Sequence, residues 1–265
     1  MKAIRKVLTI AGSDSGAGAG IQADLKTFAA LGVYGTSAIT AITAQNTLGV
    51  TQVLAIDPKL VGAQIDAIIG DIGAHALKTG MLANAGIIDI VVKKIRAHHL
   101  KNIVVDPVMV ATSGDLLIHK SAVVALRGKL IPLATVVTPN IPEAEELTGM
   151  KLSGSEEIRE AAKSISKMGA RTVVIKGGHL SGPAMDLFYD GKKFVTLNAP
   201  RLRSKNTHGT GCTLSAAIAA YLAQGEKIES AVTLAKRFIT RAIQKSFPIG
   251  AGHSPVHHFH RFWKI

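Results

Sequence analysis

The sequence predicts an α/β fold in which a mostly parallel sheet lies between layers of helices. Short apolar runs alternate with helical patterns from one end of the chain to the other. Several of these runs are continuous rather than alternating, which is typical of parallel strands that are covered on both faces. No linker or low-complexity segment interrupts the pattern. We therefore expect a three-layer α/β/α sandwich that forms one domain over residues 1–265.

The expected strands are short runs dominated by β-branched and other apolar residues, which suit a buried pleated sheet. In chain order they cover residues 7–11, 37–43, 50–56, 76–79, 103–106, 135–138, 172–176, 184–189 and 193–197. Helical patterns fill the intervals between them. The expected helices cover residues 20–31, 58–69, 85–99, 120–130, 141–148, 155–168, 212–224 and 227–245.

The charge balance is basic because acidic residues are scarce. Lys and Arg total 31 against 18 Asp and Glu, a formal charge of +13, yet only 18% of residues are charged, against about 25% in typical proteins. The densest basic group is predicted to be a solvated helix face, and it comprises Lys236, Arg237, Arg241 and Lys245. One Trp and three Tyr do not supply the aromatic residues that a nucleic-acid surface interleaves with its bases. The positive field favours an anionic ligand such as a nucleotide.

Cysteine usage and hydropathy indicate a cytoplasmic protein. Cys212 is the sole cysteine, which excludes a disulfide scaffold and favours a reducing compartment. The apolar run at 7–11 is too short for the core of a signal peptide. No apolar stretch approaches the roughly 18 residues that cross a bilayer, so no membrane partner is expected.

Three polar residues fall at or just past the ends of expected strands. They are Asp106, Asn140 and Lys176. Ligands of open α/β sheets bind outside the carboxyl ends of the strands, so these residues are site candidates. Capping or turn formation remains an alternative for each of them.

The first glycine cluster, residues 12–20, follows a strand and opens a helix. A dinucleotide-binding loop would need G-x-G-x-x-G and an acidic residue about 20 positions further on. The chain instead spaces Gly16, Gly18 and Gly20 evenly, and no Asp or Glu occurs between Asp24 and Asp57. A hydride-transfer function is therefore disfavoured, and a P-loop is excluded because its motif is absent.

The second cluster, residues 207–213, carries the sharper signal. Its glycines allow successive N–H groups to point at one anion, and the helix that follows adds partial positive charge. Such a hole stabilises charge on a transferred phosphoryl group. Cys212 in the first turn is predicted to have a lowered thiol pKa and to accept a proton from a substrate hydroxyl. The alternative is a small buried cysteine at a helix start.

Two further motifs could serve a nucleotide. Asn140 and Glu143 share one edge of a helix start, where a carboxylate could act through Mg²⁺ or its waters, although a capping box explains the pair equally well. The run Lys176-Gly177-Gly178-His179 offers a base and two glycines to phosphates, or forms a plain turn. Four C-terminal histidines lack a metal-binding spacing and are predicted to be surface or loop residues: His253, His257, His258 and His260.

Together these motifs closely resemble the hydroxymethylpyrimidine/phosphomethylpyrimidine kinases, a thiamine-biosynthetic family of the ribokinase-like superfamily. The matching stretches run in order through essentially the whole chain, at residues 11–24, 31–50, 106–109, 138–143, 176–179 and 206–212. The resemblance implies ATP-dependent phosphorylation of the hydroxymethyl group and then of the resulting monophosphate. It also implies a homodimer.

The resemblance further implies a role for each matching residue. Cys212 matches the catalytic base, and Gln45 matches the residue that binds the pyrimidine, since a carboxamide complements an amino group beside a ring nitrogen. The anion hole is matched by Gly209, Thr210 and Gly211, with Lys176 among the catalytic residues. The substrate side is otherwise matched by Gly12, Asp24, Thr43, Met81 and Val108. The ATP side is matched by Asp106, Asn140, Glu143, Lys176 and Thr210, with Asp106 and Glu143 near Mg²⁺, through water.

Two other functions stay open at this point. A pyridoxal kinase of the same superfamily would act on a similar hydroxymethyl group, and Gln45 alone does not exclude it. A non-catalytic sensor of the pyrimidine phosphate would be expected to lose the anion hole or Cys212, and both are present.

Overall fold

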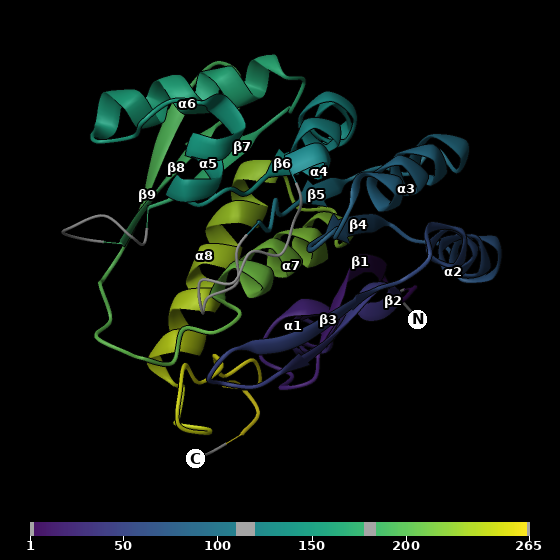
Figure 1. The fold of residues 1–265 in the computed structure, drawn as a ribbon. Coiled ribbons are helices and arrows are strands. Elements are labelled where there is room, and N and C mark those ends of the chain that lie inside the picture. The colour runs from purple at the N-terminus through teal and green to yellow at the C-terminus, as the bar shows by residue number, and fades with distance from the viewer. Residues whose placement is uncertain (1–2, 110–119, 178–183, 264–265) are drawn as a thin grey trace.

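Nine strands form one sheet, in the order β3-β2-β1-β4-β5-β6-β7-β8-β9, within the part of the chain that this computed structural model describes (Figure 1). The description covers residues 3–109, 120–177 and 184–263. Neighbouring strands from β2 to β7 in that order run parallel, whereas β3, β8 and β9 are antiparallel to their neighbours. The strands are β1 (Lys6–Asp14), β2 (Tyr34–Gln45), β3 (Val50–Ala55), β4 (Ala76–Thr79), β5 (Ile103–Val105), β6 (Val136–Val137), β7 (Val173–Lys176), β8 (Ala184–Tyr189) and β9 (Phe194–Ala199).

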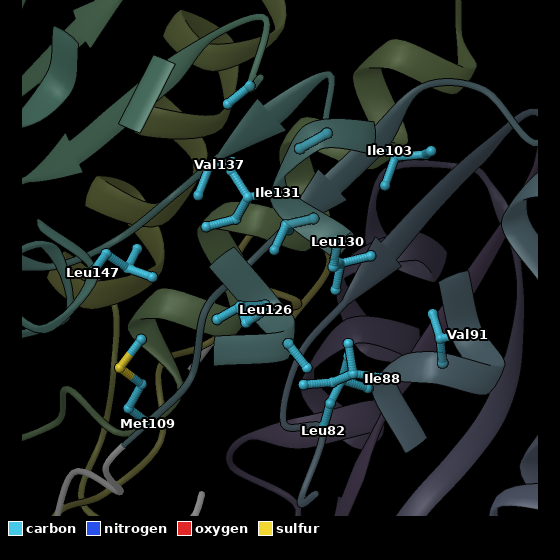
Figure 2. Packing of buried hydrophobic residues seen from close by; sticks show 14 of the residues in the cluster. Leu82, Ile88, Val91, Ile103, Met109, Leu126, Leu130, Ile131, Val137 and Leu147 are labelled. Atoms are coloured by element: carbon cyan, nitrogen blue, oxygen red, sulfur yellow. The ribbon is translucent and has the colours of Figure 1, made fainter. Parts of the chain in front are cut away.

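Helices cover both faces of this sheet, which confirms the three-layer arrangement. Consecutive residues of the parallel strands point to opposite faces, so Val7 and Val104 pack with one helical layer and Leu8 and Val105 with the other. The first layer holds α1 (Gly20–Ala30), α7 (Thr210–Ala223) and α8 (Ile228–Gln244). The second holds α2 (Pro58–Asp71), α3 (Ala85–Ala97), α4 (Lys120–Ala125), α5 (Ile141–Thr148) and α6 (Ser155–Lys167). Figure 2 shows the core beneath this second layer.

The expected single helix over 120–130 is wrong in one respect. After α4 the chain widens into a π-helical turn, Leu126–Leu130, and then tightens into a 3₁₀ turn, Ile131–Leu133. The N–H of Ile131 reaches the carbonyl of Leu126. This change of pitch places Leu126, Leu130 and Ile131 together in the core (Figure 2). Burial of these three side chains accounts for the departure from a regular helix.

The carboxyl ends of the parallel strands meet at one edge of the sheet. Asp14 and Gln45 end β1 and β2, and Asp106 directly follows β5. Asn140 and Lys176 form an isolated bridge there, in which the Lys176 N–H donates to the carbonyl of Pro139 at 2.8 Å. The fold thus gathers the strand-end residues that the sequence singled out.

The basic face of α8 is solvated only in part. Arg237, Arg241 and Lys245 are exposed, as expected, but Lys236 is largely buried and pairs with Asp186 on β8 at 2.6 Å. Lys236 therefore fastens α8 to the edge of the sheet. None of the helices in the described ranges is both long and apolar enough to cross a bilayer.

The C-terminal histidines lie in a turn-rich segment after α8, as predicted for loop residues. His257 and His258 are nevertheless buried, so a surface position is wrong for these two. The cause is a cluster of rings in which His257 packs edge-on against Phe247, at 5.1 Å between centroids. Residues 3–109, 120–177 and 184–263 hold no group of three or more His, Cys, Asp or Glu side chains that could bind a metal ion.

Candidate active site

Asp14 organises the first glycine-rich loop, and sequence reasoning did not identify it. Its carboxylate accepts hydrogen bonds from the N–H groups of Gly16, Gly18 and Ala19 at 2.8–3.0 Å. The loop ends at Gly20, whose φ of +56° and close approach to the Gly12 carbonyl leave no room for a Cβ. An acidic residue before a Gly-rich run is the signal that could have predicted this role.

The second glycine-rich loop packs directly on the first. Gly209 has φ +75° at the start of α7, and a Cβ there would overlap the carbonyl oxygen of Gly18. The N–H of Gly20, in the first turn of α1, hydrogen-bonds the sulfur of Cys212 in the first turn of α7. The N-termini of two helices therefore converge on Cys212, which concentrates partial positive charge at the thiol.

The expected lowering of the Cys212 pKa is wrong for this structure. Burial of the sulfur raises the pKa of the Cys212 thiol to about 11, although the Lys78 ammonium acts in the opposite direction. Desolvation of a thiolate thus outweighs the favourable field of the helix ends. The thiol is protonated at neutral pH here, and Lys78 is the side chain that most favours its ionisation.

Beneath Cys212 lies an ion pair with no exposed surface. Lys78 on β4 donates to Asp24 on α1 at 2.9 Å, and Thr9 donates to the same carboxylate oxygen at 2.6 Å. Burial raises the pKa of Asp24 above its ordinary value, and Lys78 opposes that shift. Lys78 was not singled out from the sequence, although a lysine within an otherwise uncharged strand is an informative signal.

The nucleotide-side candidates form a second cluster of charges. Lys176 donates to Asp106 at 2.9 Å and lies 3.6 Å from Glu143. Thr138 donates to the same oxygen of Asp106 at 3.1 Å, and the hydroxyl of Ser215 lies 3.2 Å from the other oxygen. Burial opposes ionisation of Asp106, but the adjacent Lys176 and the hydrogen bonds hold its pKa below the usual value. Burial raises the pKa of Glu143.

Asn140 and Glu143 also form the capping box that was the structural alternative. The Asn140 side chain accepts from the Glu143 N–H at 2.9 Å, and the Glu143 carboxylate accepts from the Asn140 N–H at 2.7 Å. The two readings are compatible, because the same glutamate oxygen also faces Lys176. Gly211 adjoins this cluster, since a Cβ there would lie 3.2 Å from the Lys176 nitrogen.

The candidates for the substrate side lie around the end of β1. Gly12 faces Met81, whose sulfur would lie 3.2 Å from a Cβ at position 12. Thr43 donates to the Ser13 carbonyl at 2.9 Å and contacts the Gln45 carboxamide at 3.0 Å. Val108 is half-buried and packs against the core beneath the second helical layer. Gly178 and His179 lie outside the described residues.

His208 joins the substrate side to the second loop and is another residue that sequence reasoning missed. Its Nε2 lies 2.8 Å from an oxygen of Asp14 and 3.4 Å from the Gln45 carboxamide. Its backbone pairs with the C-terminal segment, where the His208 N–H donates to Ser254 at 3.1 Å. These partners are distant in sequence, so no spacing rule could have revealed them.

Comparison with known proteins gives the family. The sequence model described as "Phosphomethylpyrimidine kinase" matches residues 14–257. The chain is 54% identical to a hydroxymethylpyrimidine/phosphomethylpyrimidine kinase of Rhizobium meliloti, over 97% of this chain and 98% of that protein. It is 53% identical to the thiamine biosynthesis bifunctional protein ThiED of Geobacter sulfurreducens over 95% of its own length, but spans only 52% of that relative.

Solved structures agree with this assignment. A Bacillus subtilis pyridoxal kinase in complex with ADP superposes with a TM-score of 0.91 at 44% identity, covering 98% of this chain and all of that one. A Clostridium difficile phosphomethylpyrimidine kinase superposes with a TM-score of 0.81 at 46% identity, covering 90% and 99% of the two chains. The fold is therefore that of the ribokinase-like kinases, as expected. The chain belongs to the phosphomethylpyrimidine kinase family.

Proposed function

We propose that this chain uses ATP to phosphorylate 4-amino-5-hydroxymethyl-2-methylpyrimidine, and then its monophosphate to the diphosphate, for thiamine biosynthesis. The observation that carries the proposal is the convergence of two glycine-rich loops and two helix N-termini on Cys212. The names of full-length relatives at about half identity support the same substrate. We further propose that residues 1–265 act as one kinase domain.

In the proposed reaction, the substrate hydroxyl oxygen attacks the terminal phosphorus of ATP. The bond from that phosphorus to the bridging oxygen breaks, ADP leaves, and the hydroxyl proton passes to Cys212, whose thiol must first have lost its own proton. The N–H groups of residues 209–212 stabilise the charge on the transferred group. Lys176 lies beside Gly211 and is placed to contact the same phosphate.

The donor set beside Lys176 fits a magnesium ion held through water. Asp106 and Glu143 both direct carboxylate oxygens at the Lys176 ammonium, at 2.9 and 3.6 Å, and Mg²⁺ is usually held by one or two carboxylates with substrate phosphates. When bound, the ion would neutralise phosphate charge. Asn140 and Thr210 complete the proposed ATP side, where Asn140 orients Glu143 through the capping box.

ADP release under identical conditions tests the substrate. We would compare hydroxymethylpyrimidine, its monophosphate and pyridoxal with Mg²⁺ and ATP. Turnover of both pyrimidines well above pyridoxal is the expected result. A preference for pyridoxal would move the protein to vitamin B6 salvage, and silence with all three from protein that still binds the pyrimidine would favour a sensor.

Pyridoxal phosphorylation is the second candidate function. It is favoured by the superposition with proteins named pyridoxal kinases, including the Staphylococcus aureus enzyme in complex with pyridoxal at a TM-score of 0.91. Gln45→Leu distinguishes the two, because it leaves a donor and an acceptor of the pyrimidine unmatched, at a cost of roughly 1–3 kcal/mol in selectivity. An unchanged preference between the two rings would exclude Gln45 as the selective residue.

We also propose a homodimer formed through the exposed face of β2 and β3. Ile42 and Leu54 are cross-strand partners, and their side chains are 49% and 66% exposed. Exposed apolar sheet faces of this kind favour association with a second copy. Leu54→Lys is expected to shift sedimentation from dimer to monomer, with Leu60→Lys, an exposed residue on α2, as the control. A wild-type monomer would contradict the proposal.

The proposed base implies a compartment. Cys212 must remain reduced, because only the thiolate of a reduced cysteine can accept the proton and an oxidised sulfur could not do so. A reducing, cytoplasmic location is therefore proposed.

A further inference from the structure

The carboxamide of Gln45 lies between two hydrogen-bond chains that determine which of its ends faces which side. The first chain runs through Thr43, whose hydroxyl oxygen lies 2.9 Å from the Ser13 carbonyl and 3.0 Å from the carboxamide atom placed as Oε1. A hydroxyl carries a single proton, and a carbonyl oxygen only accepts. The Thr43 proton therefore goes to Ser13, and Thr43 can only accept from Gln45.

The second chain runs through His208. Its Nε2 lies 2.8 Å from Asp14, whose carboxylate also accepts from the N–H groups of Gly18 and Ala19. Although burial opposes it, hydrogen bonding to His208 and to the loop lowers the pKa of Asp14, so this carboxylate is ionised and cannot donate. Nε2 of His208 must then carry the proton. The other end of the carboxamide, the atom placed as Nε2, lies 3.4 Å from Nε2 of His208 and has to be an acceptor.

Both chains demand the same arrangement, and each does so independently of the other. We infer that the amide nitrogen and oxygen of Gln45 occupy the reverse of these placed positions, with the nitrogen facing Thr43 and the oxygen facing His208, and that Thr43, His208 and Asp14 are positioning residues for substrate recognition. The two ends of a carboxamide are nearly isosteric, and hydrogen-bond partners decide between them. The orientation itself does not depend on the proposed pyrimidine substrate, whereas its consequence for substrate selectivity rests on that proposed function.

The consequence is a fixed order of hydrogen-bonding groups. With one amide N–H given to Thr43 and one lone pair of the oxygen facing His208, Gln45 keeps one N–H and one lone pair for a ligand. An aminopyrimidine offers a ring nitrogen that accepts beside an amino group that donates. A ring that presents these groups in the reverse order would set donor against donor. The two hydrogen-bond chains therefore fix the orientation of the Gln45 carboxamide, so that its free donor and free acceptor face the ligand in one order.

The kinetics of Thr43 variants test this orientation of the Gln45 carboxamide. Thr43→Val keeps the shape but removes the acceptor, so the carboxamide can turn over, and KM for hydroxymethylpyrimidine is expected to rise about tenfold. KM for ATP should not change. Thr43→Ser retains the hydroxyl and should restore KM to near the wild-type value. Equal KM for Val and wild type, or equal impairment of Val and Ser, would overturn the inference.

The protonation of His208 provides a readout that needs no turnover. In protein labelled with ¹⁵N-histidine, two-bond ¹H–¹⁵N correlations identify the ring nitrogen that carries the proton, and His208→Asn assigns the signals. A proton on Nε2 is expected. An unprotonated Nε2 would accept from the Gln45 nitrogen and overturn the arrangement. If the wild type phosphorylates neither pyrimidine, the proposed function fails, whereas this measurement still decides the orientation of Gln45.

Discussion

At the scale of single residues, burial and charge act in opposite directions on Cys212. Burial raises the pKa of the thiol to about 11, while Lys78 favours the thiolate. The resting thiol is therefore a poor nucleophile and a poor base at neutral pH. For the sulfur to accept a proton, the positive charge near it must increase enough to lower the thiol pKa and populate the thiolate. The Lys78–Asp24 pair, which has no exposed surface, is the fixed part of that field.

Alkylation reports this pKa directly because Cys212 is the sole cysteine of the chain. Below the thiol pKa of about 11, the thiolate fraction increases about tenfold per pH unit. The rate of iodoacetamide labelling is expected to follow that slope from neutral to strongly alkaline pH. Cys212→Ala should abolish labelling and lower kcat by about 10²–10⁴ with pyrimidine binding retained. A labelling rate that levels off near neutral pH would contradict the raised pKa.

The buried ion pair makes a prediction about stability. Lys78→Met would leave Asp24 buried without its cation and with only the Thr9 hydroxyl as a partner, so the free energy of unfolding should fall by about 3–5 kcal/mol. Lys129 pairs with Asp89 where both side chains are about half exposed, and Lys129→Met should change stability by less than about 1 kcal/mol. Urea unfolding measures both variants. Similar losses would mean that burial does not govern the cost.

At the scale of elements, the two glycine-rich loops depend on each other's backbone. The N-cap of α7 is Gly209, which has positive φ and touches the carbonyl of Gly18. That contact sets the position of α7 relative to α1, and so the distance between their N-termini. The proposed anion hole is thus a property of two helix starts rather than of one motif.

A matched pair of glycine variants separates backbone strain from this contact. Gly209 and Gly149 have φ of +75° and +74°, but a Cβ at Gly149 meets nothing within 4 Å. Both Gly→Ala changes should lose about 1 kcal/mol of stability from strain alone. Only Gly209→Ala should also lower kcat, because α7 must move away from Gly18. Equal kcat for the two variants would show that the loops do not need this contact.

At the scale of the whole molecule, sequence pattern predicts the layers well and the site only in part. Continuous apolar runs indicate strands covered on both faces, and positions at strand ends bring Asp106 and Lys176 to one edge. Pairs such as Asp14 with His208 could not be predicted, because they join segments far apart in sequence. The Cys212 pKa was mispredicted for a related reason, since burial is created by tertiary packing.

The C-terminal segment is the largest feature that the sequence did not connect to the site. After α8 it passes the tip of the β2–β3 hairpin, where the His253 N–H donates to Thr47 at 2.8 Å (Figure 1). It then pairs with His208 in the second glycine-rich loop. His258 ends this path with a contact of 3.0 Å to Thr213 in α7. The segment therefore connects the proposed substrate side to the proposed anion hole.

His258 makes this tie sensitive to acid. Burial lowers the pKa of His258 to about 3, against about 6.5 in the unfolded chain. Between these values only the unfolded chain binds the proton, so the free energy of unfolding should fall by about 2 kcal/mol from pH 7 to pH 5 through this group. His258→Gln should remove that share of the pH dependence in urea unfolding, whereas His99→Gln, at an exposed position, should preserve it. An unaltered pH dependence in His258→Gln would mean that His258 is not held uncharged by burial in the folded protein.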